Sequence, residues 1–138
     1  MKKEIRGFTL IELLVVIAII GLLSTMAVVA LNNARQKARD AKRVSDIKQI
    51  QTALELFFND ASSYPTIGSI ASAGAVAYQG TTYMAVVPSN PTPNGTAYTY
   101  TGLGTFPSVT GYELTYTVEG QVGDIPAGFH TATPSGIK

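Results

Sequence analysis

Hydrophobic residues are distributed very unevenly along the chain. Residues 8–31 form a run of 24 positions in which Glu12 is the single charged residue and Leu, Ile, Val and Ala predominate. An α-helix rises about 1.5 Å per residue, so roughly 20 such residues cross the hydrocarbon core of a bilayer. The pattern therefore predicts a membrane-spanning helix over residues 8–31.

This run is followed by an amphipathic pattern over residues 32–60, with no break between the two. Apolar or small residues recur in steps of three and four, and polar residues fill many of the other positions, which predicts that the same helix continues with one apolar face. Pro65 disfavours helical backbone at Tyr64, so we expect the helix to end near Asp60. A seam of small residues suits close approach of another helix or of a sheet: Ala34, Ala38 and Ala41.

Residues 61–138 show the alternating pattern of β-strands. Residues 96–101 and 112–119 alternate between the two faces of an extended chain, which predicts two or three antiparallel strands laid on the amphipathic half of the helix. The predicted fold class is α+β, a long N-terminal helix packed against a small antiparallel sheet. Other segments are expected to be a loop with a short helical turn (67–85), a loop too long for a tight two-residue turn (102–111), and an edge strand or surface loop (120–138).

Composition narrows the chemistry that the chain can perform. It has 138 residues, a formal net charge of +1, no cysteine and a single histidine, His130. These counts exclude disulfides, thiolate metal sites and clusters of histidine ligands. We find no nucleophile or paired-carboxylate arrangement and expect no enzymatic activity, no cofactor and no metal site. Asp124 is expected to be a turn residue and His130 an exposed loop residue.

A cluster of positive charge lies in the amphipathic stretch. Residues 35–48 hold six basic residues against Asp40 and Asp46. Three interpretations are open: a solvated or intersubunit-paired helix face, contact with lipid headgroups, and binding of nucleic acid. The residues that would make headgroup or DNA contacts are Arg35, Lys37, Arg39, Lys42 and Arg43.

The residues before the apolar run set its orientation. Residues 1–7 carry three basic side chains against Glu4, which by the positive-inside rule keeps the N-terminus cytoplasmic and the rest of the chain outside. A secretory signal has the same polarity, but its apolar region is only about 7 to 15 residues long.

A charged residue within a membrane helix costs about 2.5–3.5 kcal/mol on insertion scales, so Glu12 needs a partner or a purpose. Cleavage between Gly7 and Phe8 would create an amine four residues before Glu12.

The stretch Gly-Phe-Thr-Leu-Ile-Glu at residues 7–12, heading an apolar helix behind a basic leader, resembles the class III signal of type IV pilins and type II secretion pseudopilins. The resemblance implies cleavage after Gly7 by a prepilin peptidase and N-methylation of Phe8. It also implies that Glu12 neutralises the N-terminal amine of a neighbouring subunit. Gly21 is retained as a point of helix flexibility, whereas the proline that many relatives have further along this helix is replaced here by Val29.

Four segments follow from these patterns: a leader (1–7), a transmembrane and filament-core helix (8–31), its amphipathic continuation (32–60) and an extracytoplasmic head (61–138). The resemblance implies a pilin of a type IV pilus or related filament, serving adhesion, motility or DNA uptake. Its implied partners are further copies of the chain, a prepilin peptidase, an assembly ATPase, a platform protein and the membrane. It would be a single-pass precursor in the cytoplasmic membrane and then a surface filament. The alternatives are a type II secretion pseudopilin and a non-polymerising anchored binding domain.

Overall fold

The computed structural model describes residues 7–66, 74–105 and 107–138 of the chain. Contacts between residues divide it into two compact units, the first ending at Arg35 and the second running from Gln36 to Lys138. Of the predicted leader, only its last residue, Gly7, lies within the described residues.

The N-terminal element is the helix α1, Leu10–Ala61, which has 52 residues. The sequence predicts one continuous helix over residues 8–60, and the structure confirms it to within two residues at either end. α1 ends because Ser62 adopts a left-handed backbone conformation, with a φ of 53°, while its N–H donates to the carbonyl oxygen of Phe58 at 2.7 Å. A residue in this conformation after the last turn is a common way for a helix to stop.

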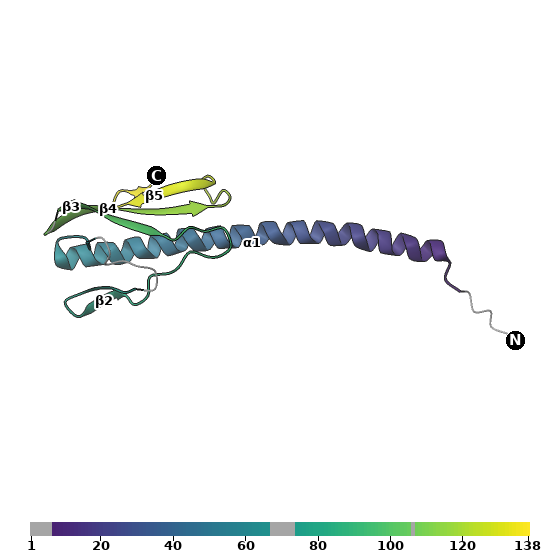
Figure 1. The fold of residues 1–138 in the computed structure, drawn as a ribbon, viewed down its shortest axis with the longest axis horizontal. Helices are drawn as coiled ribbons and strands as arrows, with labels where there is room; N and C mark the ends of the chain where they lie inside the picture. The colour runs from purple at the N-terminus through teal and green to yellow at the C-terminus, as the bar shows by residue number, and fades with distance from the viewer. Residues whose placement is uncertain (1–6, 67–73, 106) are drawn as a thin grey trace. The chain divides into compact units, whose positions relative to one another are not determined.

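The second unit contains two antiparallel sheets. A hairpin joins β1 to β2, and the larger sheet has the strand order β3-β4-β5-β6. The strands are β1 (Val76–Tyr78), β2 (Thr81–Met84), β3 (Thr99–Thr105), β4 (Ser108–Val118), β5 (Gly128–Thr133) and β6 (Gly136–Ile137). Figure 1 shows β3, β4 and β5 along one side of the C-terminal half of α1 and β2 on the opposite side. The α+β fold class predicted from the sequence is thereby confirmed.

Two predictions about the head are corrected. The loop expected at residues 102–111 is instead paired strand, because β3 and β4 continue to Thr105 and from Ser108. The region expected to be a loop at 67–85 contains the β1–β2 hairpin, turned by Gln79 and Gly80, whose φ values of 46° and 86° suit a tight hairpin turn. Residues 67–73 of that region lie outside the described residues. For residues 120–138 the edge-strand alternative is confirmed, because the segment forms β5 and the edge strand β6, and the larger sheet has four strands.

The core lies between α1 and the inner face of the larger sheet. Tyr112, Leu114, Tyr116 and Val118 alternate along β4 and are buried. They meet apolar residues from α1 that recur at helical spacing, namely Val44, Ile47, Ile50, Leu54 and Phe57. Tyrosines predominate among the aromatic residues of this core.

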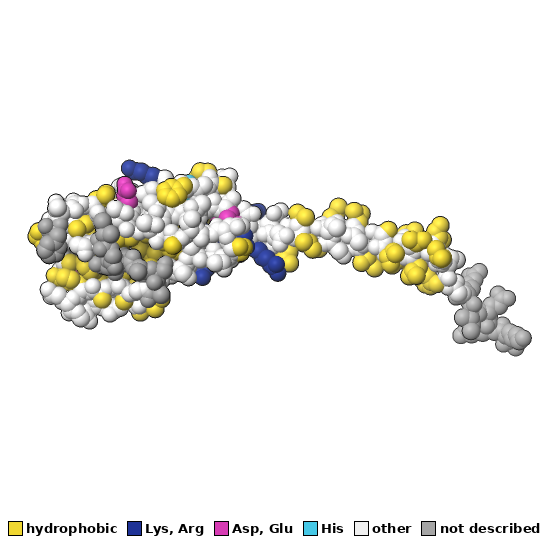
Figure 2. Space-filling view, in the orientation of Figure 1, with side chains coloured by type: hydrophobic (Ala, Val, Ile, Leu, Met, Phe, Trp, Pro, Cys, Tyr) yellow, Lys and Arg dark blue, Asp and Glu magenta, His cyan; other side chains and the backbone are white. Residues whose placement is uncertain are grey.

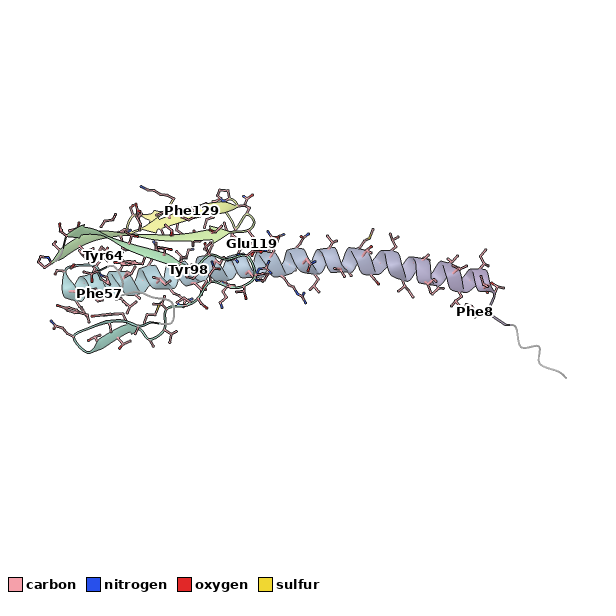
Figure 3. The ribbon with its side chains drawn as sticks, viewed as in Figure 1. Phe8, Phe57, Tyr64, Tyr98, Glu119 and Phe129 are labelled. Carbon is pink, nitrogen blue, oxygen red and sulfur yellow. The ribbon has the colours of Figure 1, made fainter. Side chains whose placement is uncertain are left out.

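Aromatic rings also fix the hairpin to the helix. The ring of Phe57 lies 5.3 Å from that of Tyr78 and 5.9 Å from that of Tyr83, within the range in which such pairs attract. On the sheet side, the Tyr64 ring packs edge-on against that of Tyr112 at 4.9 Å. Figure 3 shows Phe57 and Tyr64 at the same end of α1.

Candidate functional site: the N-terminal segment and the basic collar

The predicted assembly residue, Glu12, lies in the first turn of α1. Its Oε2 accepts hydrogen bonds from the backbone N–H of Thr9 at 2.8 Å and from the hydroxyl of Thr9 at 2.7 Å. In return the N–H of Glu12 donates to the Thr9 hydroxyl oxygen at 3.3 Å. This reciprocal arrangement is a capping box, which explains why α1 begins at Leu10 rather than at Phe8.

The N-terminal unit has a largely apolar surface. Phe8 has 81% of its surface exposed, and the large hydrophobic side chains of α1 up to Leu31 are between 44% and 77% exposed. In the part of the chain that the structure describes, α1 is the one helix that is long and apolar enough to cross a membrane. Figure 2 shows hydrophobic side chains gathered along its N-terminal part. A surface of this kind requires a bilayer or neighbouring subunits to cover it.

Gly7 and Gly21 occupy open positions. A Cβ added to either would meet no atom within 4 Å, so packing within this chain does not require glycine at either site. α1 is unbroken across Gly21 and Val29. The hydroxyl of Thr25 donates back to the carbonyl oxygen of Leu22 at 2.8 Å.

The basic segment, called the collar here and comprising residues 35–48, is partly neutralised within the chain. Arg39 binds Glu119 with two parallel hydrogen bonds, Nε to Oε1 at 2.9 Å and Nη2 to Oε2 at 2.8 Å. Arg43 Nη1 donates to Glu119 Oε1 at 2.7 Å and to Asp40 Oδ1 at 2.5 Å. The hydrogen bonds from Arg39 have the largest effect and, together with those from Arg43, lower the pKa of Glu119 to about 2.

Arg43 also holds the connector that leads into the sheet. Its Nε donates to Asn90 Oδ1 at 2.7 Å and its Nη2 to the carbonyl oxygen of Pro91 at 3.0 Å. Asp40 completes the network by accepting the backbone N–H groups of Glu119 and Gly120 at 2.9 and 2.8 Å. Figure 3 shows Glu119 beside α1.

Two of the residues predicted for contact with headgroups or DNA are engaged in ion pairs within the chain. Arg43 is fully buried, so its guanidinium is not available to an external phosphate, and Arg39, whose side chain is 21% exposed, forms a bidentate pair with Glu119. Arg35, Lys37 and Lys42 are exposed. His130, expected in an exposed loop, is instead buried in β5, where its Nε2 lies 2.8 Å from the carbonyl oxygen of Pro126.

Sequence reasoning missed the partners of these residues. Thr9 was detectable, because Thr-x-x-Glu ahead of an apolar run is the pattern of a capping box. Glu119 and Asn90 carried no such signal, since they lie 80 and 47 residues away in sequence from the arginines that they meet.

Comparison with known proteins shows what the N-terminal segment is similar to. Residues 2–28 match the family model described as the prokaryotic N-terminal methylation motif. The type II secretion system core protein G of Dickeya chrysanthemi is 42% identical over 66 residues, which is 48% of this chain and 43% of that protein. The corresponding protein of Vibrio cholerae is 36% identical over 93 residues, 67% of this chain and 56% of that protein.

A pilin is similar as well. The type IV major pilin protein PilA of Myxococcus xanthus is 36% identical over 59 residues, 43% of this chain and 27% of that protein. The chain spans about half the length of the two secretion proteins and about a quarter of the pilin. No solved structure matches it. The resemblance to pilins and pseudopilins predicted from the N-terminal residues is confirmed.

Proposed function

We propose that this chain is a structural subunit of a type IV pilus or related filament, polymerised through its N-terminal helix. The observation that carries the proposal is the exposed apolar surface of α1 up to Leu31, headed by Phe8, Thr9 and Glu12. In the membrane, lipid covers this surface, and in a filament, the same surface on neighbouring copies does so. The two states bury similar apolar area, which allows a subunit to move from one to the other.

Processing provides the group that Glu12 needs. A prepilin peptidase would cut after Gly7 and methylate the new amine of Phe8. Because packing within the chain leaves a Cβ at Gly7 unopposed, the requirement for glycine would arise in the peptidase. The methylated amine of one copy and the carboxylate of Glu12 of its neighbour would then form an ion pair inside the apolar core, where an unpaired charge is strongly disfavoured.

The subunit is inserted in the membrane with its N-terminus in the cytoplasm and its head outside, and an assembly ATPase and a platform protein extract it into the filament. The head, residues 61–138, faces outward. Adhesion, motility and DNA uptake are the roles open to such a filament. Gly21 would allow the helix to bend as copies pack.

A pseudopilin of a type II secretion system is the second candidate. It is favoured by the core protein G relatives, which match up to 67% of this chain. Both candidates share processing, the role of Glu12 and assembly, and they differ in whether the filament reaches the cell surface or stays short within the envelope.

The test combines two measurements on cells that express the full chain. Mass spectrometry should find a mature N-terminus at N-methylated Phe8, and electron microscopy of sheared material should show filaments containing the chain. Gly7→Val should retain the leader and yield no filaments. An unmethylated, uncut chain that stays in the membrane would overturn the proposal in favour of a non-polymerising anchored domain. Filaments that appear only when the chain is overexpressed alongside secretion genes would favour the pseudopilin.

A further inference from the structure

One face of α1 in the second unit is left uncovered by the sheet and the hairpin. Ala38, Ala41, Ser45 and Thr52 recur at spacings of three, four and seven and are all exposed, whereas Ile47, Ile50 and Leu54 are fully buried in the core and Val44 lies at its edge. The small side chains leave a shallow groove of about 410 Å³, lined by Ala41, Val44, Ser45, Lys48, Gln49 and Thr52.

The groove carries positive charge that the chain itself does not neutralise. Lys48 lines it, and within the described residues the side chain of Lys48 takes part in no ion pair or hydrogen bond. Arg39 and Arg43, by contrast, are matched by Asp40 and Glu119. The collar therefore presents outward only the cations for which the head offers no partner.

The head carries an exposed carboxylate, Asp124, whose negative charge is opposite to that of Lys48. Asp124 is exposed at the tip of a two-residue turn, which is closed by reciprocal backbone hydrogen bonds between Val122 and Ile125 at 2.8 and 3.0 Å. The side chain of Gln121 braces the turn by donating to the carbonyl oxygen of Gly123 at 3.0 Å. Within the described residues the carboxylate of Asp124 has no ion pair or hydrogen bond, and no group of three or more potential ligands surrounds it to hold a metal ion.

Lys48 and the segment that leads to the Asp124 turn lie at different levels along α1. The segment leading to this turn is fixed to Asp40, which accepts the N–H of Gly120. Lys48 is eight residues further along α1, or about 12 Å at 1.5 Å per residue. A second copy displaced along the helix axis would bring its turn to the level of the groove.

We propose that the groove of one copy receives the Asp124 turn of a neighbouring copy, with Lys48 pairing with Asp124 between them. This inference rests on the proposed function as a filament subunit and names the contact between its heads. The small residues of the groove allow the turn to approach the helix backbone, and the opposite charges fix the axial displacement between copies. A contact of this kind repeats at every subunit, so a weak pair acts many times along a filament.

Charge reversal tests the contact. Lys48→Glu and Asp124→Lys each place like charges together, so each should lower the yield of sheared filaments about tenfold. The double variant restores opposite charges and should recover most of the wild-type yield. Lys138→Glu and Glu113→Lys make the same changes at other exposed positions and should assemble normally. Thermal unfolding of every variant should match the wild type, because all four positions are exposed.

Normal assembly of either single variant, or a double variant no better than the singles, would overturn the contact while leaving the filament proposal in place. Normal assembly of Lys48→Glu with reduced retention of DNA would assign the groove to nucleic acid instead. Failure of the wild-type chain to form filaments would overturn the proposed function itself. The chain has no cysteine, so a Lys48→Cys, Asp124→Cys variant joined by a short bis-maleimide should give a ladder of linked subunits, and Lys48→Cys, Glu113→Cys should not.

Discussion

Glu12 has two separable roles at the residue scale. As the third residue of the helix it caps the N-terminus through the N–H and hydroxyl of Thr9. Under the proposed function, its carboxylate would also pair with the amine of a neighbouring copy. If the subunit is first held in a membrane, as proposed, its hydrogen bonds with Thr9 would reduce the cost of the charge, because they satisfy lone pairs that lipid cannot.

Three substitutions separate these roles. Glu12→Gln keeps the capping geometry and removes the charge, Thr9→Ala removes the cap and keeps the charge, and Glu12→Ala removes both. We expect Glu12→Gln and Glu12→Ala to be cleaved but absent from sheared filaments, and Thr9→Ala to assemble. Immunoblots of membrane and sheared fractions measure both steps. Normal assembly of Glu12→Gln would show that the cap, and not the charge, matters.

Arg43 is the residue on which the join between helix and head depends. Its guanidinium is fully buried and meets Asp40, Glu119, Asn90 and the connector carbonyl oxygens. Removing one partner of a buried ion pair leaves an uncompensated charge and costs about 3–5 kcal/mol. We therefore expect Arg43→Met to lower the free energy of unfolding by about 3 kcal/mol.

Chemical denaturation of the full chain in detergent measures this change. Lys42→Met is the matched control, since it removes an exposed neighbouring cation and should change stability by less than about 0.5 kcal/mol. Equal effects of the two substitutions would contradict the structural role of Arg43. Arg43→Lys should also destabilise, because one ammonium cannot reach oxygens on both the helix and the connector.

At the scale of elements, the helix was the most predictable part of the chain. Its apolar run and the later spacing of three and four residues both point to one long helix, and Pro65 marks its end. The sheet was harder to predict because β3 contains two glycines, Gly102 and Gly104, which usually indicate a loop. Gly104 adopts a φ of 131°, and a Cβ there would lie 2.7 Å from the carbonyl oxygen of Ser108. The glycine permits close pairing of β3 with β4 rather than interrupting it.

The site was predictable to a similar degree. The motif that contains Gly7, Phe8 and Glu12 was recognised, and residues 2–28 match the N-terminal methylation motif, because its signal lies within a few adjacent residues. The collar was misjudged because the charge balance of residues 35–48 omits Glu119, which reaches it only after the chain has folded back along α1. Local sequence therefore reveals the segment that acts on other molecules, and misses the ion pairs that close the head on the helix.

We expect Gly21 to influence the stiffness of α1 in its apolar part. Glycine costs about 1 kcal/mol in a helix relative to alanine, and a Cβ at this position would meet nothing within 4 Å. We expect Gly21→Ala to be processed normally and to give filaments that bend less, measured as a longer persistence length in electron micrographs. Ala18→Ser, an exposed change on the same helix, is the control. An unchanged persistence length would show that bending does not involve Gly21.

At the scale of the whole molecule, two carboxylates give the head opposing responses to pH. Glu119 has its pKa lowered to about 2, with its bonds to Arg39 as the first cause. Asp46 has its pKa raised, mainly by burial, although Tyr98 donates to its Oδ2 at 3.2 Å. A group whose pKa is lower in the folded chain stabilises it above its ordinary pKa, and a group whose pKa is higher does the reverse.

Because the two pKa shifts have opposite signs, they lead to opposite predictions for Glu119→Gln and Asp46→Asn. The contribution of Glu119 is complete above about pH 5 and disappears as the pH falls towards about 2, so Glu119→Gln should flatten the acid limb of the stability curve. The contribution of Asp46 is complete below its ordinary pKa of about 3.9 and is lost as the pH rises, so Asp46→Asn should make that limb steeper. Thermal unfolding of the full chain in detergent from about pH 2 to pH 7 measures both, with Glu113→Gln as an exposed control that keeps the wild-type slope. Because Asn at position 46 can still accept the Tyr98 hydroxyl, a flatter limb in Asp46→Asn would mean that the buried carboxylate is stabilised by the fold rather than penalised by it.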